Sequence, residues 1–476
     1  MTAGTSVVRA TDAPDAVGRD VAPVAAVRVA LPPGTDLDPF ALAGTEGVVV
    51  ADGDRVLAGV GRARTVALPT GLDDPDGVDA AVAALAAVPC DDRVGPAVAG
   101  HPVVAFGALP FDRSAPTELV VPALTYGRES DGTAWVTMVG TAADRLPDAD
   151  DPDTPAELAR RLTPPTATAT ATTPDGSTPD DGAVGPVAVP RTADADFERS
   201  VADAVAAIRA GELVKVVLAR TVDVRATGPV DVVALARRWA RLEPACTVFG
   251  VPTRDGRFVG ASPELLVERS GRRVHSRPLA GTTDRFHDAS SGLPAELLES
   301  AKDGEEHRLV VEAIRDALDP VCDRLDVPDH PELVHLHTIT HLGTTIDGTL
   351  GIGADGSVPS ALHLVARLHP TPAVGGVPRG AAARWIGRME PVARGTYAGP
   401  VGWVDGAGDG RWMVGIRAVT VAGPSVRMTA GVGIVADSDP HTELEETRLK
   451  LRAAFGAVAP GADLDAVTLA PATAEG

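Results

Sequence analysis

Lysine, cysteine and aromatic residues are scarce in this chain of 476 residues, and each shortage narrows the possible function. The three cysteines, Cys90, Cys246 and Cys322, lie far apart without CxxC spacing, so neither a disulfide framework nor a structural zinc site is supported. No run of 18 apolar residues occurs, and the first residues lack a basic segment followed by an apolar core. We therefore expect a cytoplasmic protein that does not enter a membrane.

Positive charge is also in deficit, because the formal net charge is -22. Such an excess of acid disfavours binding to nucleic acid or to an anionic membrane, and no basic arm or basic helix overrides it. The expected partner is a small molecule. If that molecule is an anion, local arginines, backbone N–H groups or a metal ion must reverse the field at its site.

The distribution of Pro, Gly and Asp divides the chain into two structured portions. Short apolar runs between these residues predict strands in the first portion, interrupted by one helix near residues 78–88. Long amphipathic helices interleaved with strands begin near residue 196. We therefore expect five segments: a mobile N-terminal tail (1–22), a strand-rich portion (23–162), a low-complexity insert or linker (163–190), a portion of helices and strands (191–460) and a C-terminal tail (461–476).

One of only three lysines, Lys215, lies within the run LVKVVLAR, which is otherwise typical of a buried strand. The chain has 43 basic residues and uses arginine at nearly all of them. A desolvated lysine can lose its proton whereas a guanidinium cannot, so Lys215 is a candidate general base. The alternative is a structural lysine at a strand end whose ammonium group reaches water.

Two predicted helices each place acids on one face. Asp303 and Glu306 are three positions apart on a stripe that continues into apolar residues. Near the C-terminus, Glu443, Glu446 and Lys450 share one helix face. Two such helices can close a site for a hard cation, and oxygen ligands without Cys or paired His favour Mg²⁺ over zinc. The alternative is two ordinary charged helix faces.

Five further positions could serve a site. Glu264 directly follows a proline and should lie at a strand edge or turn, where it could be the acid of a proton-transfer pair; a lone glutamate is otherwise a surface residue. His341 could orient a substrate group or be a satisfied structural histidine. Gly431 and Gly433 would let the backbone approach a ligand, and Arg417 is expected on the preceding strand. No Walker loop, GxSxG elbow or complete dinucleotide fingerprint is present.

Ten motifs between residues 213 and 450 resemble, in order, those of the chorismate-utilising enzymes: KVVLAR, GASPELL, PLAGTT, KDGEEH, HLGTTIDG, LHPTPAVGG, YAGPVGW, GIRAV, AGVGIV and ELEETRLK. That family contains isochorismate, salicylate, anthranilate and aminodeoxychorismate synthases, and the chain most resembles the isochorismate synthases. The resemblance implies an α+β fold in which two large, mostly antiparallel β-sheets pack together with helices outside. The site is expected between the sheets.

The resemblance also implies a role for each matched residue. Lys215 would deprotonate a water that attacks C2 of chorismate, Glu264 would protonate the departing C4 hydroxyl, and His341 would lie near the ring carboxylate. The substrate-binding positions would be Gly281, Thr282, Ala373, Tyr397, Arg417, Gly431, Gly433 and Lys450.

The metal implied by the resemblance is Mg²⁺. Glu306 and Glu446 would hold it directly, and Asp303 and Glu443 would act through water. The bound ion would in turn bind the ring carboxylate of chorismate.

Two positions distinguish members of the family. The amine-transferring synthases carry glutamine where this chain has Lys215, so lysine indicates water as the nucleophile. Salicylate synthases typically carry threonine at Ala373, so alanine indicates that pyruvate is not eliminated. We therefore expect an isochorismate synthase, monomeric and without an obligatory glutaminase partner, that serves menaquinone or siderophore biosynthesis. The alternatives are a salicylate synthase and a non-catalytic chorismate-binding subunit.

Overall fold

The computed structural model describes residues 24–94, 98, 100–141, 146–162, 187–226, 228–284, 297–337, 339–461 and 464. The expected N-terminal tail, most of the C-terminal tail and most of the linker lie outside these residues. The last four residues predicted as linker, Val187–Pro190, instead form strand β10, which pairs with β11.

The largest sheet has thirteen strands and draws on both portions of the chain. The short strand β21 (Gly376–Val377) pairs with β11 beside the main path. Within the described residues only β1 and β5 pair in parallel. The order is β10, β11 (Lys215–Arg225), β25 (Ser425–Ile434), β24 (Ala418–Ala422), β13 (Gly256–Ser262), β12 (Thr247–Thr253), β2 (Val48–Asp52), β3 (Arg55–Val60), β8 (Leu124–Arg128), β9 (Ala134–Thr141), β1 (Val24–Ala30) and β5 (Cys90–Asp92).

A second sheet has nine strands and a third has three. The nine-stranded order is β17 (Cys322–Asp326), β20 (Ile346–Leu350), β15 (Arg273–Arg277), β14 (Leu265–Ser270), β23 (Gly410–Val414), β22 (Pro400–Asp405), β6 (Val104–Ala108), β7 (Thr117–Val121) and β4 (Arg64–Leu68). The small sheet is β16 (Leu279–Asp284), β19 (Ile339–Gly343) and β18 (Glu332–His335).

The two large sheets pack against each other through apolar side chains. One buried cluster joins Phe249 and Phe258 of the thirteen-stranded sheet to Phe106 and Trp403 of the nine-stranded sheet. Alternating apolar residues on facing strands are what such a packed pair of sheets requires. The expected α+β fold with two large, mostly antiparallel sheets is confirmed.

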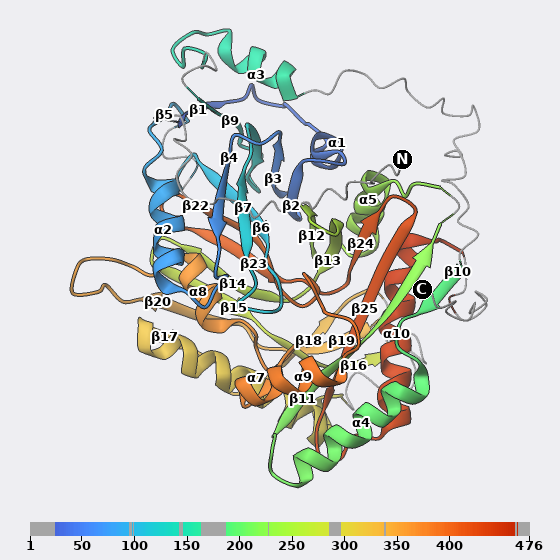
Figure 1. Cartoon of the computed structure of the whole chain (residues 1–476). Helices are drawn as coiled ribbons and strands as arrows, with labels where there is room; N and C mark the ends of the chain where they lie inside the picture. The colour runs from blue at the N-terminus through green and yellow to red at the C-terminus, as the bar shows by residue number, and fades with distance from the viewer. Residues whose placement is uncertain are drawn as a thin grey trace, which may run out of the picture.

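Helices cover the outside of this body, as Figure 1 shows for α2, α4, α7 and α9. Their bounds are α1 (Pro39–Ala43), α2 (Pro75–Ala86), α3 (Thr154–Leu162), α4 (Asp194–Arg209), α5 (Val232–Leu242), α7 (Ala301–Leu318), α8 (Ala361–Leu368), α9 (Arg379–Met389) and α10 (Pro440–Val458). Within the described ranges, no helix combines the length and the apolar character needed to cross a bilayer.

The two portions of the chain do not form separate bodies. Strand β2 of the first portion pairs with β12 of the second, and β6 pairs with β22. Figure 1 shows the blue N-terminal strands continuing the sheets that the green and red strands begin. The sheet end that carries β11 and β25 lies against α4 and α10, and this is the region that contains the predicted site residues.

Candidate active site

A cavity at this end of the large sheet is partly open to solvent and is lined by both charged and apolar side chains, as small-molecule sites are. Eleven of the fifteen predicted site residues line it: Glu264, Gly281, Glu306, His341, Ala373, Tyr397, Arg417, Gly431, Gly433, Glu446 and Lys450. Of the other four, Lys215, Asp303 and Glu443 belong to the surrounding ion pairs, and the side chain of Thr282 lies outside the described parts of the structure.

Lys215 begins β11, and its side chain is 0% exposed. Its Nζ donates a hydrogen bond of 2.8 Å to Oε1 of Glu306. A Cβ on Gly433 of the neighbouring strand would lie 2.4 Å from that oxygen and 3.0 Å from Cε of Lys215, so the absence of a side chain at Gly433 leaves the space that the ion pair occupies. The alternative of a lysine that reaches water is therefore wrong. The ammonium group lies behind Glu306, which itself faces the cavity.

Glu264 lies between β13 and β14, as the preceding proline predicts, and faces the cavity while only 3% exposed. Burial raises its pKa to about 8, although attraction from Lys215, a hydrogen bond from the N–H of Leu279 and attraction from Lys450 oppose the shift. A carboxyl group with this pKa keeps its proton at neutral pH, which suits a general acid. The surface alternative for Glu264 is excluded.

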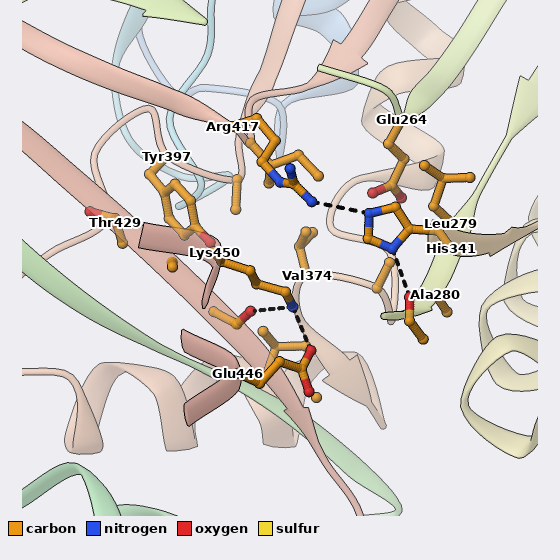
Figure 2. A pocket seen from close by; sticks show the side chains of 18 of the residues that line it. Glu264, Leu279, Ala280, His341, Val374, Tyr397, Arg417, Thr429, Glu446 and Lys450 are labelled. Atoms are coloured by element: carbon orange, nitrogen blue, oxygen red, sulfur yellow. Dashed lines mark hydrogen bonds and ion pairs between the residues drawn. The ribbon is translucent and has the colours of Figure 1, made fainter. Parts of the chain in front are cut away.

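His341 on β19 faces Arg417, as Figure 2 shows. Burial, and then the charge of Arg417, lower the pKa of His341 to about 3, so the ring is neutral. Its Nδ1–H donates to the carbonyl oxygen of Gly281 at 2.7 Å, and its Nε2 accepts from Nη2 of Arg417 at 3.1 Å. This tautomer follows from the two partners, since a carbonyl only accepts and a guanidinium only donates. His341 thus orients Arg417 at the cavity wall.

The backbone of Arg417 departs from the prediction. The residue lies between β23 and β24, not on a strand, and its φ is 52°. A left-handed conformation in a residue with a side chain costs about 1 kcal/mol or more, and such strain is common at functional sites. The carbonyl oxygen of Arg417 accepts a 3.0 Å hydrogen bond from the N–H of Ala261, which fixes this turn against β13. The periodicity of GIRAV could not show this turn.

Lys450 and Tyr397 place two more donors on the same wall (Figure 2). Nζ of Lys450 pairs with Oε1 of Glu446 at 2.8 Å and donates to the carbonyl oxygen of Gly431 at 3.0 Å. Burial raises the pKa of Tyr397 to about 12, so its hydroxyl stays protonated. With Arg417, these groups can bind the carboxylates of a small anion.

Asp303 and Glu306 lie in the first turns of α7 and share one electrostatic environment. Burial raises the pKa of Asp303, and repulsion from Glu306 and Glu446 adds to the shift, against a hydrogen bond from Ser300. Burial alone would raise the pKa of Glu306, but the attraction and hydrogen bond of Lys215 outweigh it and hold that pKa below its usual value. The acids of α7 are therefore close to those of α10.

Glu443 completes the acid cluster from α10. It is 1% exposed, and its Oε1 accepts from Nζ of Lys302 at 2.8 Å. Burial and then repulsion from Glu446 raise its pKa, against the hydrogen bond and charge of Lys302 and a weaker interaction with the Ser438 hydroxyl. The donors of this cluster are carboxylate oxygens without Cys or His, which is the ligand type that Mg²⁺ prefers.

The acid cluster is not arranged around a single point. In the part of the chain that the structure describes, no three His, Cys, Asp or Glu side chains are grouped so that they could hold a metal ion. Three glutamates of the cluster instead each pair with a lysine ammonium group: Glu306 with Lys215, Glu443 with Lys302, and Glu446 with Lys450. A metal ion would therefore have to exchange with these internal cations.

Arg394, which no sequence pattern singled out, also lines the cavity and is 3% exposed. It donates to the carbonyl oxygens of Val374 at 2.6 Å and Val217 at 2.9 Å, pairs with Glu390, and lies 4.2 Å from the ring centroid of Phe111. Most basic residues of this chain are arginines, so the presence of an arginine at position 394 did not indicate a functional residue. The four-residue spacing from Glu390 was the only local hint.

Comparison with known families and proteins gives consistent matches. The model of the family described as "Chorismate binding enzyme" matches residues 52–459. A protein of Mycobacterium tuberculosis provisionally named isochorismate synthase MenF is 38% identical over 377 residues, covering 76% of this chain and 88% of that protein. Isochorismate synthase DhbC of Bacillus subtilis is 42% identical over 268 residues, covering 54% of this chain and 66% of that protein.

Solved structures show the same fold. A provisionally assigned 2,3-dihydroxybenzoate-specific isochorismate synthase, DhbC of Bacillus anthracis, has a TM-score of 0.68 and 31% identity, covering 87% of this chain and 96% of that chain. The menaquinone-specific isochorismate synthase MenF of Escherichia coli has a TM-score of 0.71 at 24% identity, covering 92% and 95%. At that identity the second likeness supports the fold alone.

Proposed function

The chain belongs to the chorismate-binding enzyme family, and on that premise we propose that it is an isochorismate synthase. The observation that carries the proposal is that Glu264, Arg417 and Lys450 line one cavity. Lys215 lies directly behind Glu306, which forms part of the wall of that cavity. The names of the relatives support it, because those at 38% and 42% identity are called isochorismate synthases. The reaction would be the reversible isomerisation of chorismate.

In the proposed reaction Lys215, in its neutral amine form, takes a proton from a water molecule whose oxygen bonds to C2 of chorismate. The ring double bonds shift, the C4–O bond breaks, and Glu264 donates a proton to the departing hydroxyl, so that one water enters and one leaves. Glu264 is suited to this role because burial raises its pKa to about 8 and it keeps its proton. The product and the reactant have the same charge, composition and oxidation level, so the reaction needs no oxidant or reductant.

Binding of the substrate carboxylates falls to the donors on the cavity wall. Arg417, held by the neutral ring of His341, and Lys450 supply positive charge, and Tyr397 supplies a hydroxyl donor. Mg²⁺ on Glu306 and Glu446, with Asp303 and Glu443 acting through water, would supply a further positive charge for the ring carboxylate. This recruits a dianion to a chain whose net charge is -22.

The nearest rival is a salicylate synthase, which would use the same acid, base and metal and then expel pyruvate. Ala373 lines the cavity. Salicylate synthases, which resemble this chain in the motif LHPTPAV, typically carry threonine at this position, so alanine favours the simple isomerase. Lys215 disfavours ammonia as the nucleophile. We further propose that the chain acts as a monomer without a glutaminase subunit.

Chromatography of the products separates these functions. Purified protein is incubated with chorismate and Mg²⁺, with and without ammonia, and compared with Glu264→Gln under the same conditions. Isochorismate in equilibrium with chorismate, without pyruvate, supports the proposal. Salicylate and pyruvate formed in step with chorismate loss would establish the rival. An aminated product would refute water as the nucleophile. If no product forms, the chain is a non-catalytic chorismate-binding subunit.

A further inference from the structure

All three lysines of the chain bind acids of the proposed metal cluster. Lys215 pairs with Glu306, Lys302 with Glu443 and Lys450 with Glu446, each at 2.8 Å. The chain uses arginine at the other basic positions, so these pairs stand apart in chemistry as well as in place. An ammonium group is a compact point charge on a flexible stem, whereas a guanidinium binds carboxylates in a rigid fork. Lysine is therefore the base that can most readily give up a carboxylate.

The three pairs differ in how easily the lysine could leave. Lys215 is 0% exposed, and Lys450 is 19% exposed and also bound to the carbonyl oxygen of Gly431. Lys302 is 37% exposed, and Glu443 is the acid with which its ammonium group pairs. Its side chain can turn into water without breaking a bond to the backbone. Among the three lysines, Lys302 is therefore the one that can most easily leave its carboxylate for solvent.

The acid that Lys302 binds cannot stay charged alone. Glu443 is 1% exposed, and a buried carboxylate left without a cation is strongly destabilising. The bond to Lys302 also joins the first turn of α7 to the first turn of α10, which are the two helices that carry the four acids. Lys302 thus neutralises the cluster at the point where the helices meet.

We propose that Lys302 is an internal cation that competes with the divalent metal ion for this acid cluster: it neutralises Glu443 when no metal is bound and turns into solvent when the metal binds. The inference rests on the proposed metal site and deepens it. It also accounts for the absence, among the described residues, of three acids grouped around one point. Lys302 is a positioning residue here, because it acts through Glu443 and does not touch the reacting atoms.

Amine labelling tests the exchange directly, without substrate or turnover. The full chain is treated with a small amine-reactive reagent at fixed pH and ionic strength, with either saturating MgCl₂ or NaCl, and labelling at each lysine is followed by mass spectrometry. We expect labelling of Lys302 to rise several-fold in Mg²⁺. In Glu446→Gln, which weakens the proposed metal site, the same addition should have little effect. Unchanged or slower labelling of Lys302 in wild type, at Mg²⁺ concentrations that calorimetry shows to be saturating, would overturn the proposal.

A second measurement gives the sign of the coupling. Titration calorimetry with MgCl₂ is compared for wild type, Lys302→Met and Lys302→Arg, after thermal melting has shown that each is folded. Removing the competing charge should tighten Mg²⁺ binding by about tenfold, and Lys302→Arg should not bind more tightly than wild type. Weaker binding by Lys302→Met would show that Lys302 instead supports the site and would overturn the proposal. Mg²⁺ binding with the expected coupling but without isochorismate formation would refute the proposed function alone, and absence of Mg²⁺ binding would refute the metal site and this inference together.

Discussion

Nη2 of Arg394 donates a hydrogen bond of 2.9 Å to the carbonyl oxygen of Val217, two residues along β11 from Lys215. Glu390, the ion-pair partner of Arg394, accepts from the N–H of Ala219 on the same strand. Strand β21 is only two residues long and pairs with β11 at Lys215 and Val216. Beyond β21, the side chains of Arg394 and Glu390 bind the backbone of β11 in place of a neighbouring strand. A buried ion pair thus fixes the strand that begins with Lys215.

The ion pair of Arg394 with Glu390 should stabilise the fold. Arg394→Met should destabilise the fold by about 3 kcal/mol, because it leaves Glu390 buried without a cation and two carbonyl groups without donors. Chemical unfolding followed by circular dichroism measures the loss. Arg93→Met removes the solvent-exposed ion pairs of Arg93 with Asp91 and Asp150 and is the control, with a much smaller expected change. Equal changes in the two variants would contradict the role given to Arg394.

Gly433 should not tolerate a methyl group. Its added Cβ would lie 2.4 Å from Oε1 of Glu306, so Gly433→Ala should separate Glu306 from Lys215 and reduce turnover at least about 100-fold. Gly456→Ala is the matched control, since nothing lies within 4 Å of a Cβ there and alanine favours the helix. Turnover and melting temperature are compared for both. Normal turnover in Gly433→Ala would show that the ion pair is dispensable.

Glu264 predicts an alkaline limit on activity. Burial raises its pKa to about 8, so the acid form is present below that pH and is lost above it. The forward rate should therefore fall as pH rises through about 8. Glu264→Gln should lower kcat by about 100-fold or more while chorismate still binds, and its residual activity should lack this fall. An unchanged alkaline limb in the variant would assign the titration to another group.

Local chemistry made part of this site predictable. The lysine in an apolar run, the glutamate after a proline and the acids at helical spacing each stood out because their types conflict with their surroundings. The alternation of apolar residues likewise predicted strands, but it could not show that β2 pairs with β12 across some 200 residues, since pairing of distant strands leaves no local pattern. Arg417 on a left-handed turn and Arg394 among many arginines carried no such conflict. Nor does spacing show which lysine pairs with which glutamate, because those bonds join different elements.

The account depends most on Lys215 as the base. A guanidinium cannot accept a proton, so Lys215→Arg should be as inactive as Lys215→Gln, whereas both should still bind chorismate through Arg417 and Lys450. Melting temperature and equilibrium binding of chorismate establish that each variant is folded and loaded.

The deciding measurement is single-turnover conversion of bound chorismate to isochorismate by Lys215→Arg beside the wild type. We predict a rate reduced by about 100-fold or more, as expected for loss of a general base. A rate within about tenfold of wild type would contradict the account, because Lys215 would then supply only positive charge and another group would activate the water.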